Sequence, residues 1–184
     1  MLLLKDPALP NLCRLVAGAR CEGHGWRTRV LKRSLRSMML RRDHPDVLLL
    51  KLISRKVTYV HRPLWPQIVA IGRARALWQT KDLSTLSRKL LAEVDRVPVE
   101  PGRDKAAAAK ELDARMLVFI AQFHSESGAH LLRLESWDHW SNRTHFRRHS
   151  TTSALARKAL EERIVNLNRE VAGRGRLPWQ GKLE

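Results

Sequence analysis

The stretch that decides the fold is residues 103–124, RDKAAAAKELDARMLVFIAQFH, where a helical pattern changes to a strand-like one. Alanine, lysine and leucine favour a helix over residues 103–116. The apolar run that follows predicts a strand over 116–124. Residues 125–128 supply turn chemistry, and a second strand is expected over 129–137. The sequence therefore predicts a helix followed directly by a β-hairpin.

Two further helices are predicted before this stretch. Pro63 and Pro66 suit the first turn of a helix that runs to about Trp78. Ser84 is a suitable N-cap for a second helix, over residues 85–95. The inward positions predicted for the two helices are Trp65, Ile68, Val69 and Gly72 in the first and Leu86, Leu90, Leu91 and Val94 in the second. A Pro/Gly-rich segment then separates both from the third helix.

This order of three helices and a hairpin is that of a winged helix-turn-helix, in which two helices brace a third and the hairpin forms the wing. We therefore predict an α+β, mostly helical fold with this winged-helix module over residues 61–150. Residues 1–60 are expected to form a basic N-terminal extension with an amphipathic helix and a short strand. Residues 151–184 are expected to form a C-terminal helix and a basic tail.

The segments on either side of the module carry their own patterns. Residues 27–42 predict a basic amphipathic helix, which suits a phosphate-tracking face, a membrane surface or simple docking by its apolar stripe. Residues 46–53 are apolar but too short to distinguish helix from strand, whereas residues 56–60 alternate as a strand does. The stripe predicted for a long helix from Thr152 to about Val171 consists of Leu155, Leu160, Ile164, Leu167 and Val171. The tail over residues 176–180 is expected to be loose.

The charge balance indicates the class of partner. The chain has 35 Lys and Arg against 18 Asp and Glu, a formal net charge of +17. Such an excess repels itself unless a polyanion is near, and nucleic acid is the commonest polyanion. DNA is favoured over RNA here. An acidic membrane surface, an acidic protein or plain solubility are the other interpretations.

Composition also excludes several classes. No run approaches the length of a spanning helix, and the apolar start is too short for a signal peptide. Cys13 and Cys21 lack the paired spacing of a structural zinc site. The sequence contains no Gly-rich phosphate loop, no Gly-x-Ser-x-Gly elbow and no evident Cys/His dyad. We expect a cytoplasmic protein (nucleoid-associated if bacterial) with no cofactor, no metal and no membrane partner.

The predicted third helix has two chemically distinct sides at 100° per residue. The inward side is predicted to hold Ala108, Ala109, Leu112 and Met116, and the outward side Arg103, Ala106, Ala107, Lys110 and Ala114. Small residues between two cations let the helix approach a duplex closely, while the cations reach bases or phosphates. A plain solvated helix whose alanines reflect helix propensity is the alternative.

Hydroxyl groups and cations at the tip and along one edge of the hairpin suit phosphate contacts, although a solvated turn explains them almost as well. The candidate nucleic-acid-binding residues are Arg103, Lys105, Ala106 and Lys110 on the third helix, His124, Ser125, Ser127, His130 and Arg133 on the hairpin, and Arg33 and Arg36 on the N-terminal helix. Few of these side chains read bases well, which indicates weak sequence specificity and favours recognition of shape or damage.

Histidines and tryptophans raise two further possibilities. The histidines after the third helix lack a spacing that forces them together, apart from His145 and His149 if that stretch is helical, so surface imidazoles are the preferred interpretation. Four tryptophans are predicted to belong to the core, namely Trp65, Trp78, Trp137 and Trp140. Trp26 and Trp179 are the better candidates for stacking on exposed bases.

Part of the amino-acid sequence resembles a known family. The segments that carry the resemblance are Lys105-Ala-Ala-Ala-Ala-Lys-Glu-Leu112, Arg115-Met-Leu-Val-Phe119, His124-Ser-Glu-Ser-Gly-Ala-His130 and Leu134-Glu-Ser-Trp-Asp-His-Trp140. They look like the winged-helix DNA-binding family that includes the crosslink-repair DNA glycosylases, over roughly residues 60–170. The resemblance implies DNA binding and a link to repair.

Enzyme activity does not carry over with that resemblance. Those glycosylases are larger and use a Gln-x-Gln or Gln-x-Asp motif, which none of Gln67, Gln79, Gln122 and Gln180 provides. No catalytic residue is therefore assigned. One alternative is a glycosylase-like enzyme that acts on damaged bases. The other is a structural RNA-binding or ribonucleoprotein component, with which a net charge of +17 agrees equally well.

Overall fold

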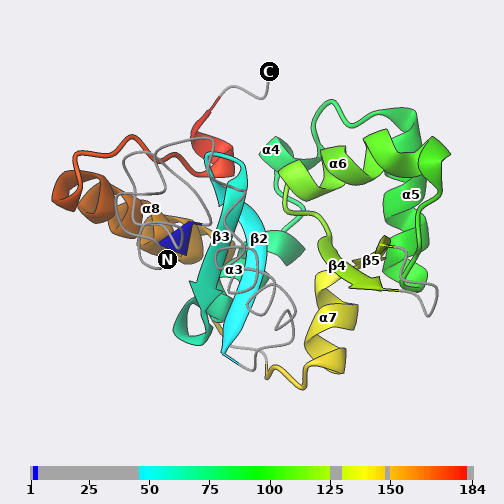
Figure 1. The fold of residues 1–184 in the computed structure, drawn as a ribbon, viewed down its shortest axis with the longest axis horizontal. Helices are drawn as coiled ribbons and strands as arrows, with labels where there is room; N and C mark the ends of the chain where they lie inside the picture. The colour runs from blue at the N-terminus through cyan, green and yellow to red at the C-terminus, as the bar shows by residue number, and fades with distance from the viewer. Residues whose placement is uncertain (1, 4–45, 125–129, 148–149, 182–184) are drawn as a thin grey trace, which may run out of the picture. The chain divides into compact units, whose positions relative to one another are not determined.

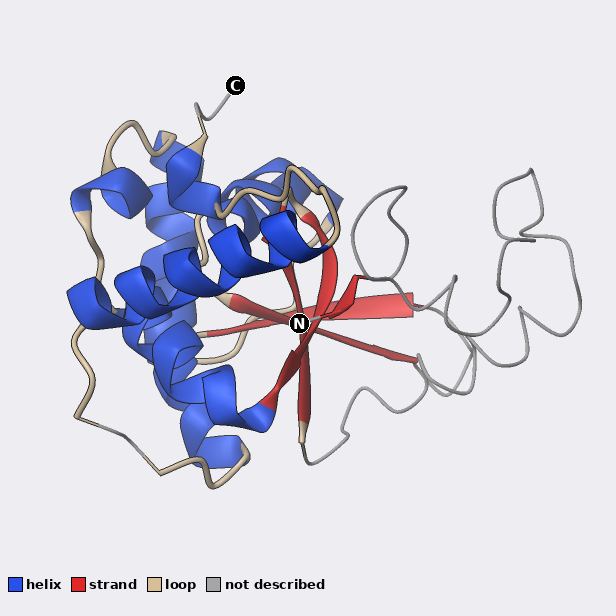
Figure 2. Ribbon diagram, turned by 90° about the vertical axis from the view of Figure 1, so that its left-hand side faces the viewer, coloured by secondary structure: helices blue, strands red, loops and turns tan. Residues whose placement is uncertain are grey.

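The computed structural model describes residues 2–3, 46–124, 130–147 and 150–181 (Figure 1). These residues form helices and two small antiparallel sheets, an α+β arrangement (Figure 2). The chain divides into two units, residues 1–65 with 160–184 and residues 66–159. The predicted N-terminal helix over residues 27–42, with Arg33 and Arg36, lies outside the described residues, as does Trp26.

The first unit is built on a β-hairpin. Strand β2 (Val47–Ile53) pairs antiparallel with β3 (Lys56–His61), and β1 (Leu2–Leu3) pairs with the other edge of β3. Ser54 and Arg55 join β2 to β3 with φ of 49° and 57°, the positive values that a two-residue hairpin turn requires. The predicted strand over 56–60 is confirmed. The ambiguous segment 46–53 is a strand because the tight turn places it beside β3.

Residues 176–180 are held within the first unit, so the prediction of a loose tail is wrong. Leu177 is only 2% exposed, and residues 178–180 form the short 3-10 helix η4 (Pro178–Gln180). The Ser54 N–H donates to the Arg176 carbonyl at 2.7 Å. The Trp179 indole N–H donates to a Glu161 carboxylate oxygen at 2.6 Å. Burial of Leu177 and these hydrogen bonds outweigh the conformational entropy that the glycine-containing segment loses when it is ordered.

The remaining helical elements belong mostly to the second unit, except for η2 and the larger part of α8, which belong to the first. They are η2 (Arg62–Leu64), α3 (Trp65–Arg73), α4 (Leu77–Thr80), α5 (Thr85–Arg96), η3 (Arg103–Lys105), α6 (Ala106–Ala114), α7 (Trp137–Arg143) and α8 (Ser153–Glu170). Of the stripe predicted for α8, Leu160 and Ile164 are buried, whereas Leu155 is 61% exposed and was assigned inward wrongly.

The single helix predicted from the two prolines to Trp78 is wrong, because the chain breaks after α3. Arg75 has a φ of 50°, which no helix accommodates. Helix α4 then begins anew, with the Gln79 side chain accepting the Ala76 N–H at 2.9 Å. An ion pair between Arg75 and Asp95 fastens this break to the end of α5. The inward residues predicted for α3 are nevertheless buried.

Helix α5 largely matches its prediction. The Ser84 hydroxyl accepts the Ser87 N–H at 3.1 Å, which confirms the N-cap. Leu90, Leu91 and Val94 are buried as predicted, but Leu86 is 42% exposed. Ser87 is fully buried and takes the position in the stripe that the pattern had assigned to leucine, because the residues facing α6 recur at i, i+3, i+4 and i+7 from position 87.

The predicted β-hairpin is confirmed, with shorter strands than expected. Strand β4 (Phe119–His124) pairs with β5 (His130–Glu135), and Val99 adds an isolated bridge to Leu134 on the other side of β5. Met116, with a φ of 55°, ends the preceding helix rather than starting the strand. Trp137, predicted in the second strand, begins helix α7 instead, because the Ser136 hydroxyl accepts the His139 N–H at 3.1 Å and caps that helix.

Aromatic residues fasten α7 within the second unit. The rings of Trp137 and Trp140 lie 5.8 Å apart, and each lies about 6 Å from Phe119 on β4. The Trp137 indole N–H donates to the Met116 carbonyl at 2.8 Å. Burial of Trp65, Trp137 and Trp140 bears out the predicted core role of these three tryptophans, and Trp78 is half-buried.

Gly72 of α3 gives a stability test of this packing. A Cβ at this position would lie 2.1 Å from the Trp137 indole nitrogen. Helix propensity alone predicts that Gly72→Ala stabilises the protein by about 1 kcal/mol. We expect instead a loss of about 1–3 kcal/mol in the free energy of unfolding, because the fixed indole cannot yield.

Denaturant unfolding of both variants and the native chain measures the difference. Gly181→Ala is the control, since a Cβ placed there meets no described atom within 4 Å, its chain neighbours left aside. A Gly72→Ala protein as stable as the native one would show that α3 and the Trp137 indole are not in this close contact.

Candidate nucleic-acid interface

Helix α6 has the two sides that the sequence predicts. Ala108, Ala109 and Leu112 are 0–3% exposed and belong to one apolar cluster with α5 residues Leu90 and Val94. Met116 is also buried. On the outward side, the exposed residues are Arg103, Ala106, Ala107 and Lys110. We call these four residues the α6 face.

Spacing explains why these four residues share a side. They recur at i, i+3, i+4 and i+7, although Arg103 belongs to the preceding turn η3 rather than to α6 itself. The side chains of the two alanines end at Cβ, so they project little from the helix in the middle of the α6 face. The longer cationic side chains lie at its two ends. Such a surface combines close backbone approach with long, positively charged side chains.

Lys105 lies beside this face but is held differently. Its ammonium group lies 2.7 Å from the Glu93 carboxylate on α5. The hydrogen bond to Glu93 is the main cause that raises the pKa of Lys105 above its ordinary value. Lys105 therefore links η3 to α5, whereas Arg103 and Lys110 stand at the ends of the α6 face.

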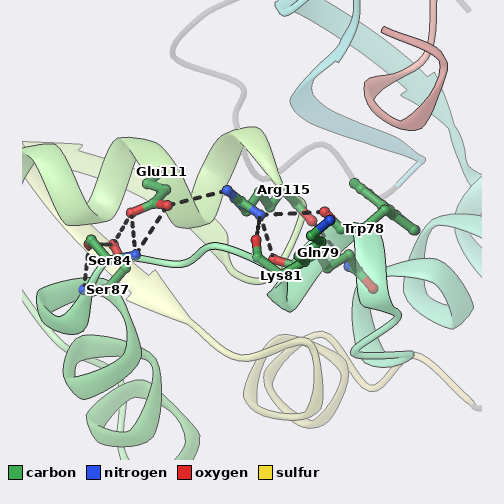
Figure 3. Close-up of polar contacts among 7 residues, drawn as sticks. All are labelled: Trp78, Gln79, Lys81, Ser84, Ser87, Glu111 and Arg115. Atoms are coloured by element: carbon green, nitrogen blue, oxygen red, sulfur yellow. Dashed lines mark hydrogen bonds and ion pairs between the residues drawn. The ribbon is translucent and has the colours of Figure 1, made fainter. Parts of the chain in front are cut away.

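A polar network orients α6 against α5 (Figure 3). The Ser87 hydroxyl donates to Glu111 at 2.6 Å, and the Ser84 N–H lies 3.4 Å from both carboxylate oxygens. Glu111 also forms an ion pair with Arg115 at 3.4 Å. One carboxylate on α6 therefore holds the capped start of α5 and the residue that ends α6.

The pKa of Glu111 reflects these contacts. Partial desolvation acts to raise it, but the hydrogen bonds from Ser87 and Ser84 and the charge of Arg115 outweigh desolvation. The pKa of Glu111 therefore lies below its ordinary value of 4.5. The ionised form is the one that the fold favours.

Arg115 is a structural cation that the sequence did not single out. It is 8% exposed, and its guanidinium donates to the carbonyls of Gln79, at 3.3 Å, and Lys81, which surround the end of α4 (Figure 3). Gln79 donates back to the Arg115 carbonyl at 3.1 Å. The only sequence signal is an arginine placed between the buried Leu112 and Met116. This positive charge serves the fold and not the α6 face.

The hairpin candidates fall into three groups. His124 and His130 are register partners at the last pair of the β4–β5 ladder, while Ser125 and Ser127 lie outside the described residues. Arg133 has a side chain 43% exposed, and its Nε lies 3.7 Å from a Glu135 oxygen. The register thus places both histidines next to the hairpin tip, and it places Arg133 further along the strand.

Arg143 on α7 is a functional candidate that the sequence prediction missed. Its Nε donates to both oxygens of Glu135 at 2.9 and 3.0 Å, and a second nitrogen donates at 2.9 Å. Glu135 is 2% exposed, whereas the side chain of Arg143 is 40% exposed. The residue was not predicted because the helix that carries it was not predicted.

Other chemistries find little support in the described part of the chain. There, no three His, Cys, Asp or Glu side chains gather as a metal site would need. His145 has a φ of 50° and lies in a turn just after α7, and His149 lies outside the described residues. Trp179, a stacking candidate, has its indole N–H engaged by Glu161.

One hollow of about 420 Å³ lies in the second unit between α3, α7 and the start of α8. Its charged lining residues are Arg73 and Asp138, which form an ion pair at 3.0 Å. The carboxylate is thus already matched by a cation, and the hollow offers no second carboxylate for paired acid and base work.

Within the described ranges, no helix has both the length and the apolarity needed to cross a bilayer. Searches against protein-family models, curated proteins and solved structures found no match for this chain.

The contacts of Glu111 predict how stability depends on pH. Because the folded-state pKa is lowered, the stabilising contribution of the carboxylate is fully present above the ordinary value of 4.5 and is lost as the pH falls through the folded-state pKa. Glu111→Gln should therefore lose about 1–2 kcal/mol at pH 7. The deficit should shrink as the pH falls below 4.5.

Thermal unfolding of the native and variant chains between neutral and acid pH measures this deficit. Glu162→Gln, on an exposed position of α8, is the matched control and should track the native chain throughout. A Glu111→Gln deficit that stays constant down to acid pH would contradict the role given to the ionised carboxylate.

Proposed function

We propose that the second unit binds duplex DNA through the phosphate backbone, with the α6 face in the major groove and the β4–β5 hairpin as a wing. The observation that carries the proposal is the α6 face itself. Two exposed cations, Arg103 and Lys110, stand at either end of two exposed alanines, on a helix whose opposite side is buried. This arrangement supports the interpretation of α6 as a winged-helix recognition element.

The dimensions and chemistry of the duplex suit this face. The major groove admits an α-helix, and alanines at its centre avoid clashes and can touch a thymine methyl group. Arginine and lysine reach phosphate oxygens or guanine edges from the ends. With so few groups able to read bases, the proposal is for binding by shape and charge, with weak sequence preference.

Further cations support backbone binding. Arg88, Lys89 and Arg96 are exposed on α5, the helix packed against α6. In sequence terms, residues 1–45, which include Arg33 and Arg36, hold ten Lys and Arg against three Asp and Glu. Each phosphate that these groups neutralise releases condensed counterions, which favours association at low salt.

The salt dependence of duplex binding tests the proposal. The logarithm of the association constant falls linearly with the logarithm of salt concentration, with a slope of about −0.9 for each phosphate contact. Replacing both cations, as Arg103→Ala with Lys110→Ala, should therefore make this slope shallower by about 1.8. Affinity should fall similarly for unrelated duplex sequences. Fluorescence anisotropy with labelled duplexes at several salt concentrations measures both quantities.

The matched control removes two exposed cations from elsewhere in the same unit, as Arg147→Ala with Lys158→Ala, and should change the slope less. An unchanged slope in the Arg103/Lys110 variant would reject the α6 face as the interface. Competition by structured RNA stronger than that by duplex DNA would favour the ribonucleoprotein alternative. Release of a base from alkylated DNA would favour the glycosylase-like alternative.

A further inference from the structure

A buried carboxylate lies between two half-exposed arginines on the hairpin and α7. Glu135 is 2% exposed, and the side chains of Arg133 and Arg143 are 43% and 40% exposed. Arg143 holds the carboxylate with two nitrogens at 2.9 Å, and Arg133 approaches it at 3.7 Å. We call these three residues the Glu135 cluster, which carries one net positive charge.

The cluster lies on the side of the hairpin that faces away from α6. Leu134 is fully buried in the apolar cluster that includes the inner side of α6. Successive side chains of a strand point to opposite faces, so Arg133 and Glu135 share the other face. That face also carries Phe119, the register partner of Glu135, which packs on the tryptophans of α7.

The geometry of the cluster suits an anion. A buried carboxylate is costly unless it is paired and hydrogen-bonded. Here the hydrogen bonds to Glu135 fix the planar guanidinium of Arg143, and that of Arg133 lies within ion-pair distance, with both side chains partly exposed. Each guanidinium has five N–H donors, and the contacts with Glu135 occupy Nε and one further nitrogen of Arg143 and Nε of Arg133. Fixed guanidinium forks match phosphate oxygens at little entropic cost.

We propose that the Glu135 cluster binds a phosphate group of the nucleic-acid backbone, as a second contact surface on the hairpin face opposite α6. This inference rests on the proposed function, because it supplies a phosphate contact for the same class of polyanion, from a segment that passes the opposite face of the hairpin. Arg133 and Arg143 make the contact, and Glu135 is a positioning residue that acts through them. The hairpin then carries phosphate contacts on the side away from the α6 face.

Two substitutions distinguish this site from charge alone. Arg143→Lys keeps the charge but removes the fork, so duplex affinity should fall about tenfold although the net charge is unchanged. Glu135→Gln removes a negative charge, which by general electrostatics should strengthen binding to a polyanion. The site predicts the opposite, a weaker complex, because the arginines lose their fixed orientation.

Fluorescence anisotropy with the full chain and a labelled duplex gives the affinities, and thermal unfolding verifies that each variant is folded. Arg147→Lys, an exposed arginine near α7 in the chain, is the control and should bind as the native chain does. If Glu135→Gln does not fold, Arg143→Lys and Arg133→Lys provide the test.

Native affinity in Arg143→Lys, or tighter binding by folded Glu135→Gln, would overturn the inference. Its failure is distinguishable from failure of the proposed function. If the salt dependence of binding still requires Arg103 and Lys110 while Arg143→Lys binds the duplex with native affinity, only the Glu135 cluster is rejected. If the chain does not bind duplex DNA at all, both proposals are rejected.

Discussion

The contact between α5 and α6 is the constraint on which the second unit depends. An apolar stripe buries one side of each helix, and Glu111 adds directional hydrogen bonds to Ser84 and Ser87 at the start of α5. The buried Leu112 and two inward alanines determine which side of α6 meets α5. The carboxylate adds a directional contact to this packing, so the residues opposite the stripe are presented to solvent.

The hairpin extends the same constraint to a second surface. Leu134 joins the α5–α6 core from one face of β5, while its neighbours Arg133 and Glu135 lie on the other face with α7. The alternation of a strand thus separates an apolar anchor from a charged cluster within three consecutive residues. Lys110 and the Glu135 cluster are consequently carried by helices and a strand, whereas Arg103 lies in the turn η3 that leads into α6.

Local chemistry explains which parts of this architecture could be predicted from the sequence. The Ser84 cap, the hairpin and the inner side of α6 follow from residue type and period, which act over a few neighbours. The break at Arg75 and the start of α7 at Trp137 involve partners distant in the chain, Asp95 for Arg75 and the Met116 carbonyl for Trp137. The hydrophobic pattern alone therefore predicted a helix and a strand that were too long. The pair of Glu135 and Arg143 joins two elements, and only the folded structure brings it together.

The most direct test of the central claim is hydrogen exchange of the full chain with and without a saturating duplex, resolved by peptide. If the α6 face enters the groove, backbone amides over residues 103–114 should exchange more slowly in the complex than in the free protein. Slowed exchange confined to other segments, with residues 103–114 unchanged, would contradict the assignment of this helix as the element that meets the nucleic acid.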